Sequence, residues 1–225
     1  MSGAPTAIVT GAGRGIGAAI ARAFTARGVR VTAFARTAAQ VERVVAEGGA
    51  ALAVAGDVRR EEDLARLLAV HERALGAVDV LVNGAGVLAR GPVEDLPAAT
   101  FREVLDVNLV GPFLCARAVV PGMKRRGRGR IVNVASISGT LGTPLASPYN
   151  ASKWGLIGFT KSLAEELRPH GIQCLAVSPG SVDTELLAQT PFPPRMAPED
   201  VARVVVFAAL DAPDAMTGAN LEVFG

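Results

Sequence analysis

Histidine, cysteine and aromatic residues are scarce in this chain of 225 residues, with two histidines, two cysteines and 4% aromatics. With only His71 and His170, neither a histidine-based metal site nor a Ser-His-Asp catalytic triad is expected. Cys115 and Cys174 lie in apolar runs and have no disulfide-framework or metal-binding spacing, so we expect buried thiols.

Net charge is also low, at +2, which argues against binding to nucleic acid or to a membrane. We find no apolar run near the ~18 residues of a membrane span and no signal-peptide pattern, and we expect a soluble cytoplasmic protein. The one dense basic run, residues 124–130, falls at the end of an expected helix. It either caps that helix or docks an acidic carrier protein.

Apolar residues make up half of the chain, and strand-like and helical patterns alternate along it. Strands are expected at 6–10, 29–35, 51–55, 78–82, 130–135, 173–177 and 220–224. Helices are expected from the turn 11–17 to Gly28 and at 38–47, 61–74, 98–126 (disturbed at 111–112), 149–168 and 198–210. Such alternation indicates a parallel sheet covered on both faces. We therefore expect one α/β domain over 1–225, a doubly wound Rossmann-type fold with seven strands.

The turn at residues 10–17, Thr-Gly-Ala-Gly-Arg-Gly-Ile-Gly, follows an apolar strand and opens a helix. Glycines let the backbone reverse tightly and approach a pyrophosphate, while the helix N-terminus presents free N–H groups. The pattern predicts a dinucleotide-binding turn, and the alternative is a plain turn.

A second group of polar residues follows the strand expected at 130–135. Ser136 stands where that strand ends, and Tyr149 and Lys153, four residues apart, share one helical face. An adjacent cation stabilises a phenolate and lowers the phenol pKa from about 10 toward neutrality. The three groups suit the protonation of an alkoxide. Alternatively, Tyr149 is a half-buried aromatic residue and Lys153 a solvated helix residue.

Taken together, these motifs resemble the short-chain dehydrogenase/reductase family, and its 3-oxoacyl-[acyl-carrier-protein] reductase-like members, along essentially the whole chain. The family's glycine pattern fits residues 10–17, and its Asn-Asn-Ala-Gly motif fits 83–86 with Gly84 as a departure. The family's serine, thirteen residues before the tyrosine of Tyr-x-x-x-Lys, fits Ser136. Its other motifs fit Asn108, Pro179-Gly180 and Thr184.

The resemblance implies a role for each matching residue. Tyr149 is the acid/base, Lys153 lowers its pKa and holds the nicotinamide ribose, and Ser136 binds the substrate oxygen. Asn108 positions a water that links Lys153 to solvent, or else only bonds backbone at the helix kink. Gly86 binds the cofactor, or else serves packing alone. Asp57 and Val58 contact the adenine. The residues expected to bind the cofactor are Gly11, Gly13, Arg14, Gly15, Ile16, Gly17, Arg36, Asp57, Val58, Asn83, Ala85, Gly86, Tyr149, Lys153, Pro179, Gly180, Val182 and Thr184.

The end of the second expected strand bears on which nucleotide binds. An acidic residue there would grip the 2′-hydroxyl of NAD, but residues 34–37 read Phe-Ala-Arg-Thr. Arg36 and Arg14 are placed to flank a 2′-phosphate, with Thr37 adding a hydroxyl, so we expect NADP rather than NAD. The alternative is that both arginines are solvated surface charges.

We therefore predict an NADP-dependent oxidoreductase that interconverts a ketone and a secondary alcohol, with a 3-oxoacyl thioester, free or carrier-tethered, as the leading substrate. The alternatives are a nucleotide-binding regulator without turnover and a nucleotide-sugar epimerase. By resemblance we expect a homo-oligomer, a tetramer. Only thirteen residues separate Thr184 from Pro198, which predicts an open pocket without a helical lid, and Phe224 replaces the family's aspartate near one subunit interface. Apolar residues expected to line the pocket are Leu141, Leu145, Leu186, Leu187 and Phe192.

Overall fold

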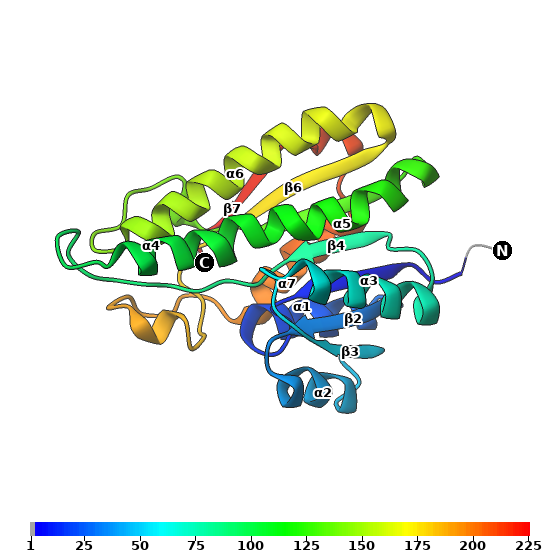
Figure 1. The fold of residues 1–225 in the computed structure, drawn as a ribbon, viewed down its shortest axis with the longest axis horizontal. Coiled ribbons are helices and arrows are strands. Elements are labelled where there is room, and N and C mark those ends of the chain that lie inside the picture. Colours follow the sequence, from blue (N-terminus) through cyan, green and yellow to red (C-terminus); the bar gives the residue numbers. More distant parts are fainter. Residues whose placement is uncertain (1–2) are drawn as a thin grey trace.

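Seven parallel strands form a single twisted sheet in the computed structural model, which describes residues 3–225 (Figure 1). The strands are β1 (Thr6–Thr10), β2 (Arg30–Ala35), β3 (Leu52–Ala55), β4 (Val80–Asn83), β5 (Gly129–Val134), β6 (Ile172–Pro179) and β7 (Asn220–Val223). Their order is β3-β2-β1-β4-β5-β6-β7. The strand order therefore reverses between β1 and β4, where ligands bind in doubly wound folds. The predicted fold class is confirmed.

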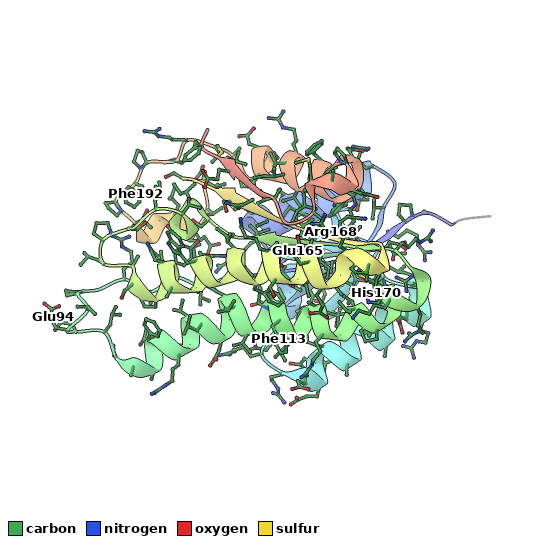
Figure 2. The ribbon with its side chains drawn as sticks, turned by 90° about the horizontal axis from the view of Figure 1, so that it is seen from above. Glu94, Phe113, Glu165, Arg168, His170 and Phe192 are labelled. Carbon is green, nitrogen blue, oxygen red and sulfur yellow. The ribbon has the colours of Figure 1, made fainter. Side chains whose placement is uncertain are left out.

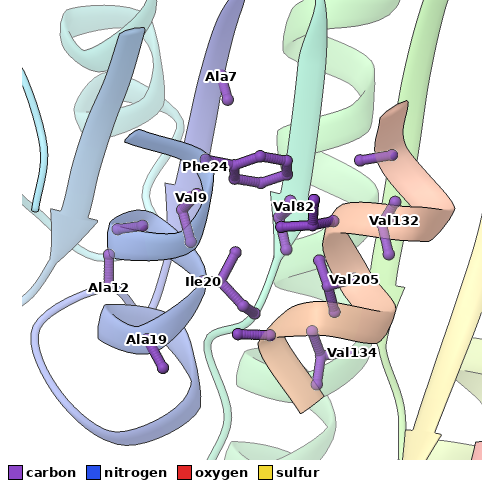
Figure 3. Close-up of a cluster of buried hydrophobic side chains, with 14 of the residues drawn as sticks. Ala7, Val9, Ala12, Ala19, Ile20, Phe24, Val82, Val132, Val134 and Val205 are labelled. Carbon is purple, nitrogen blue, oxygen red and sulfur yellow. The ribbon is translucent and has the colours of Figure 1, made fainter. Parts of the chain in front are cut away.

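Helices cover both faces of the sheet, because the strands are apolar on both sides. On one face lie α1 (Gly15–Ala26), α2 (Ala38–Ala46) and α7 (Pro198–Val206), and on the other α3 (Glu61–Leu75), α4 (Ala98–Leu105), α5 (Gly111–Arg126) and α6 (Ser147–Leu167). Figure 3 shows the first face, where Ile20 and Phe24 of α1 and Val205 of α7 pack on Val9 and Val82 of the sheet. Burial of such side chains contributes about 1.5–3 kcal/mol each.

A five-residue π-helix, Asp106–Val110, joins α4 to α5 and places the expected disturbance just before Gly111 and Pro112. A Cβ at Gly111 would lie 2.8 Å from Val58 Cγ2, so glycine lets this helix approach the segment after β3. A second π-helix, Phe207–Asp211, extends α7 in the same way. π-helical turns of this kind commonly occur beside functional sites.

The stretch Ala98–Arg126 is long and apolar enough to cross a membrane by length and composition alone, contrary to the expectation that no such run exists. In the fold, 44% of its most apolar window is buried. It packs against α3, α6 and the sheet, as the core helix of a globular domain does. The apolar composition therefore has an explanation within the fold.

The basic run at 124–130 is largely occupied by contacts within the molecule. Arg130 donates to the carbonyls of Ala208 and Ala212, at 2.9 and 2.6 Å, and Arg126 donates to the carbonyl of Val78. Lys124 and Arg128 approach Glu166 and Asp79 at 3.5 and 3.8 Å. At the adjacent end of α6, Arg168 pairs with Glu165 at 2.6 Å (Figure 2). These contacts favour the helix-capping interpretation over a docking surface.

Candidate active site

A cavity of about 810 Å³ opens at the carboxyl ends of the strands, around the point where the strand order reverses. Its wall includes most residues expected at the site, namely Gly11, Gly13, Arg14, Gly15, Ile16, Gly17, Arg36, Asp57, Val58, Ala85, Gly86, Ser136, Tyr149, Lys153, Pro179, Gly180, Val182 and Thr184. Asn83 and Asn108 do not lie on the wall. The segments after β1, β2, β3, β4, β5 and β6 therefore build one continuous site.

The glycine turn after β1 forms the end of the cavity that suits a dinucleotide. Gly11 and Gly15 have φ values of 69° and 52°, which favour glycine. A Cβ at Gly17 would lie 2.2 Å from the Gly11 carbonyl oxygen, so only glycine allows α1 to start this close to the turn. No side chain caps α1, and its first N–H groups are left for an anion. These residues fit the pyrophosphate of a nicotinamide nucleotide.

The middle of the cavity wall, between the glycine turn and the opposite, apolar end, brings together Ser136, Tyr149 and Lys153. Ser136 has an extended backbone just after β5, and its Oγ accepts a 3.1 Å bond from Ser138 N. Tyr149 and Lys153 lie one turn apart in α6, and the ammonium is 5.6 Å from the phenol ring centre. Lys153 is buried and donates a 2.8 Å bond to the carbonyl of Val134.

Burial sets the protonation of this group. The pKa of the Tyr149 phenol is raised by burial, and a hydrogen bond with Ser136 opposes that rise. Burial also lowers the pKa of Lys153 to about 8. The expected lowering of the tyrosine pKa by Lys153 is therefore not seen here, where the ammonium is directed to Val134. In this state the phenol holds its proton, as a proton donor must at neutral pH.

Asn108 is buried in the π-helix and its amide is fully engaged. It accepts from Val87 N and donates to Val87 O, both at 2.9 Å, and donates to Ser152 Oγ at 3.0 Å. A Cβ placed on Gly86 would lie 3.5 Å from Asn108 Oδ1 and 3.9 Å from Lys153 Nζ. The side chain therefore fixes the segment after β4 rather than facing the cavity, in agreement with the backbone-bonding alternative.

Asn83 is likewise an internal residue, contrary to the expectation that it contacts the cofactor. Its Nδ2 donates to Asn133 Oδ1 at 2.8 Å, and Asn133 in turn donates to Thr160 Oγ1 at 2.8 Å. This buried chain joins β4, β5 and α6. The motif at 83–86 reaches the cavity only through the residues after Asn83, because the strand ends there.

At the adenosine end, the two expected arginines differ. Arg14 is paired with Glu185, so its charge is not free for a 2′-phosphate as predicted. Arg36 has no ion pair among residues 3–225 and lies on the wall with Thr37. Asp57 is held by Arg59 at 2.5 Å, and that hydrogen bond, with a smaller contribution from Arg36, lowers its pKa.

The segment between Thr184 and Pro198 forms a wall of the cavity despite its length. It contains one short 3₁₀ turn, Leu187–Gln189, and no α-helix, as expected. Glu185 reaches Arg14, and the Phe192 ring lies 5.9 Å from the guanidinium carbon of Arg90. The segment therefore contacts both the turn after β1 and the segment after β4, and the open pocket stays a prediction.

The end of the cavity on the far side of Tyr149 from the glycine turn is mainly apolar. Leu141, Leu186, Leu187 and Phe192 line it as expected, whereas Leu145 does not. Leu145 has a left-handed φ of 62°, and its side chain is exposed. Sequence reasoning missed Leu88, Arg90, Ser138, Thr143 and Thr190, which also line the cavity. Their only sequence signal is that they follow the ends of strands or lie near Thr184.

Comparisons with known proteins agree with this geometry. A family model described as short chain dehydrogenase matches residues 5–192. A 3-oxoacyl-[acyl-carrier-protein] reductase of Synechocystis sp. is 36% identical over 99% of this chain and 96% of its own length. A 3-alpha-(or 20-beta)-hydroxysteroid dehydrogenase of Mycobacterium tuberculosis is 38% identical over 97% and 87%. The crystal structure of a 3-ketoacyl-(acyl-carrier-protein) reductase from Brucella melitensis complexed with NADH superposes with a TM-score of 0.94, at 32% identity over 99% and 98% of the two chains.

Proposed function

The chain belongs to the short-chain dehydrogenase family and is an oxidoreductase, and from this premise we propose that it uses NADP to interconvert a ketone and a secondary alcohol. The observation that carries the proposal is the meeting of Ser136, Tyr149 and Lys153 on one wall of the cavity that begins at the glycine turn. A hydroxyl, a phenol and an ammonium are what the protonation of an alkoxide needs.

The reaction divides between the cofactor and the chain. The bound nicotinamide supplies or accepts the hydride. Tyr149, which holds its proton in the buried site, gives it to the substrate oxygen or takes it back. Ser136 positions that oxygen, and Lys153 provides the cation that favours the phenolate once the proton has left. The turn at 11–17 and the N-terminus of α1 hold the pyrophosphate.

NADP rather than NAD is proposed from the chemistry after β2. No carboxylate stands at the end of the strand, where Arg36 and Thr37 follow Ala35. Arg36 lies on the cavity wall and has no ion pair among the described residues. A guanidinium matches a phosphate in geometry and charge. The Brucella melitensis structure contains NADH, so the preference for NADP rests on Arg36 of this chain.

A 3-oxoacyl thioester is proposed as the substrate class, on the apolar far end of the cavity and the names of two relatives. A carrier-tethered acyl chain is the more specific form of this substrate proposal, although the basic run at 124–130 gives it little support.

We also propose that the protein is cytoplasmic, that residues 1–225 are a single domain and that it assembles as a homotetramer. Phe113 and Trp154 stand exposed on neighbouring helices, as subunit contacts would.

The two rival functions have less support. A nucleotide-binding regulator needs none of Ser136, Tyr149 and Lys153, and the relatives reported above are reductases or dehydrogenases. A nucleotide-sugar epimerase needs room for a substrate domain, for which the short segment after β6 leaves little space.

The test is NADPH oxidation with a panel of ketones, including acetoacetyl thioesters, by the purified chain and its Tyr149→Phe variant. The variant keeps the ring but loses the proton donor, and we expect turnover to fall roughly 10²- to 10⁴-fold with NADPH binding unchanged. Near-normal turnover by Tyr149→Phe would show that Tyr149 is not the proton donor. Absence of turnover by the wild type on every ketone and alcohol would refute the function.

A further inference from the structure

Two cavity guanidinium groups, Arg36 and Arg90, have neither a hydrogen bond nor an ion pair within the part of the chain that the structure describes. The other cations of the cavity wall are engaged, since Arg14 pairs with Glu185 and Lys153 donates to a backbone carbonyl. Arg36 follows β2, on the adenosine side. Arg90 follows β4, across β1 in the sheet order, and contacts the segment after β6.

Arg90 is held in place although its charge is not matched. Its neighbour Gly91 donates a 2.8 Å bond to the carbonyl of Leu145, and three residues earlier Val87 is clamped by Asn108. The guanidinium lies over the Phe192 ring, 5.9 Å from its centre. A cation–π contact orients a guanidinium but leaves its N–H groups available.

The surroundings of Arg90 offer no internal anion. Of the carboxylates on the cavity wall, Asp57 is bound by Arg59, Glu185 by Arg14, and exposed Asp183 makes no ion pair with Arg90. Glu94 and Asp95, on the same segment as Arg90, make none either. A partly buried cation among apolar walls attracts an anion more strongly than one in water.

We propose that Arg90 binds an anionic group of the substrate, a carboxylate or a phosphate remote from the reacting carbonyl, and so selects acidic ketones over neutral ones. This assignment rests on the proposed function, because it takes Tyr149 as the place of the carbonyl. The substrate then extends from Ser136 and Tyr149 along the apolar wall to Arg90. The anion has two chemical sources: the carboxylate of a small oxo acid, or the phosphate of a phosphopantetheine thioester.

The experiment compares matched probes on three variants. Arg90→Met removes the charge and keeps an unbranched apolar stem, Arg90→Lys keeps the charge without the planar fork, and Arg102→Met removes an exposed arginine of α4 as a control. The probes are 4-oxocyclohexanecarboxylate against its methyl ester, and acetoacetyl-pantetheine against its 4′-phosphate. Binding is measured by calorimetry on the NADP⁺-loaded protein, in which the ketone probes cannot be reduced, and turnover with NADPH is measured separately.

The wild type should bind one acidic probe at least tenfold more tightly than its neutral partner. Arg90→Met should lose roughly 10-fold or more in affinity, and show a matching rise in KM, for that acidic probe only. Arg90→Lys should recover part of the loss, and Arg102→Met should behave as wild type. Whichever pair shows the effect identifies the carboxylate or the phosphate as the source.

The failures of the two proposals are distinguishable. Equal binding of acidic and neutral probes by the wild type, or equal losses on both in Arg90→Met, would overturn the role of Arg90. Selective binding of an acidic probe without any turnover would leave the role of Arg90 standing and would count against the oxidoreductase substrate class.

Discussion

Asn108 and Val87 form a closed pair: the asparagine amide accepts from the Val87 N–H and donates to the Val87 carbonyl, both at 2.9 Å. The pair holds the segment after β4 against the π-helix, and a third bond from Asn108 reaches Ser152 in α6. The residue that the family resemblance assigns to a water relay thus also fixes the backbone that leads to Gly86 and Arg90.

Replacing Asn108 by Ala should destabilise the protein by about 1–3 kcal/mol, because it leaves two backbone groups of Val87 unpaired. Asn108→Asp should cost a similar amount, since its second carboxylate oxygen would face the Val87 carbonyl. Urea unfolding measures the loss, and Asn220→Ala on the last strand is a comparison outside this contact. Unchanged stability together with a large fall in turnover would instead support a water relay.

Arg36→Ala should weaken NADPH binding more than NADH binding. A charged hydrogen bond contributes about 1.5–3 kcal/mol, or roughly 10- to 150-fold in affinity. Fluorescence titration with both nucleotides measures the difference, and Arg43→Ala on the outer side of α2 is the control. Equal losses for NADPH and NADH would show that Arg36 does not bind the 2′-phosphate.

Glu185→Gln should tighten binding of both nucleotides by a small factor, roughly 2- to 5-fold, because it frees Arg14 and removes a negative charge beside the phosphates. Thermal stability should hardly change, since both side chains of the pair are mostly exposed. Titration at low and high salt tests this, with Glu94→Gln as the charge-matched control. Weaker nucleotide binding in Glu185→Gln would contradict it.

His71 should make the protein less stable in acid. It is fully buried between the hydroxyls of Thr32 and Thr6. Burial lowers its pKa from 6.5 to about 4; the nearby Arg30 charge adds to this lowering, and the Asp79 charge opposes it. The unfolded chain therefore takes up the proton first as pH falls. The free energy of unfolding should therefore fall by about 3 kcal/mol as the pH is lowered from 6.5 to 4.

Urea unfolding of His71→Gln across that pH range provides the measurement. The variant should be less stable near neutral pH, and its stability should depend less on pH between 6.5 and 4 than that of the wild type. His170→Gln, which changes an exposed histidine, should keep the wild-type pH profile. An unchanged slope in His71→Gln would assign the acid sensitivity to other groups.

Trp154→Arg, alone or with Phe113→Arg, should break the proposed assembly into smaller species. Both aromatic side chains are about half exposed, on α6 and α5, and Figure 2 labels Phe113 on the outer side of its helix. Val119 and Leu156, on the same two helices, are buried in the core and do not contribute to this exposed surface. Light scattering measures the mass, with Val93→Arg as an exposed control, and a wild-type monomer at micromolar concentration would refute the assembly.

The sequence is enough to predict the fold class, because apolar strands, a glycine turn and helical periodicity are local patterns, and each pattern needs the same kind of packing in any protein. It also placed Ser136, Tyr149 and Lys153 on one wall, since a strand end and one helical turn fix their spacing. Most predicted strand and helix boundaries agree with the structure to within one or two residues.

Packing between distant segments sets which polar groups already have a hydrogen-bond or ion-pair partner and which remain free. Arg14 and Glu185 are 171 residues apart in sequence, and no local pattern predicts that they pair. The inward-facing amides of Asn83 and Asn108, the direction of the Lys153 ammonium and the unmatched charge of Arg90 also depend on contacts between distant segments. Desolvation and hydrogen bonding act between neighbours in space, so the chemistry of these groups follows from packing rather than from order along the chain.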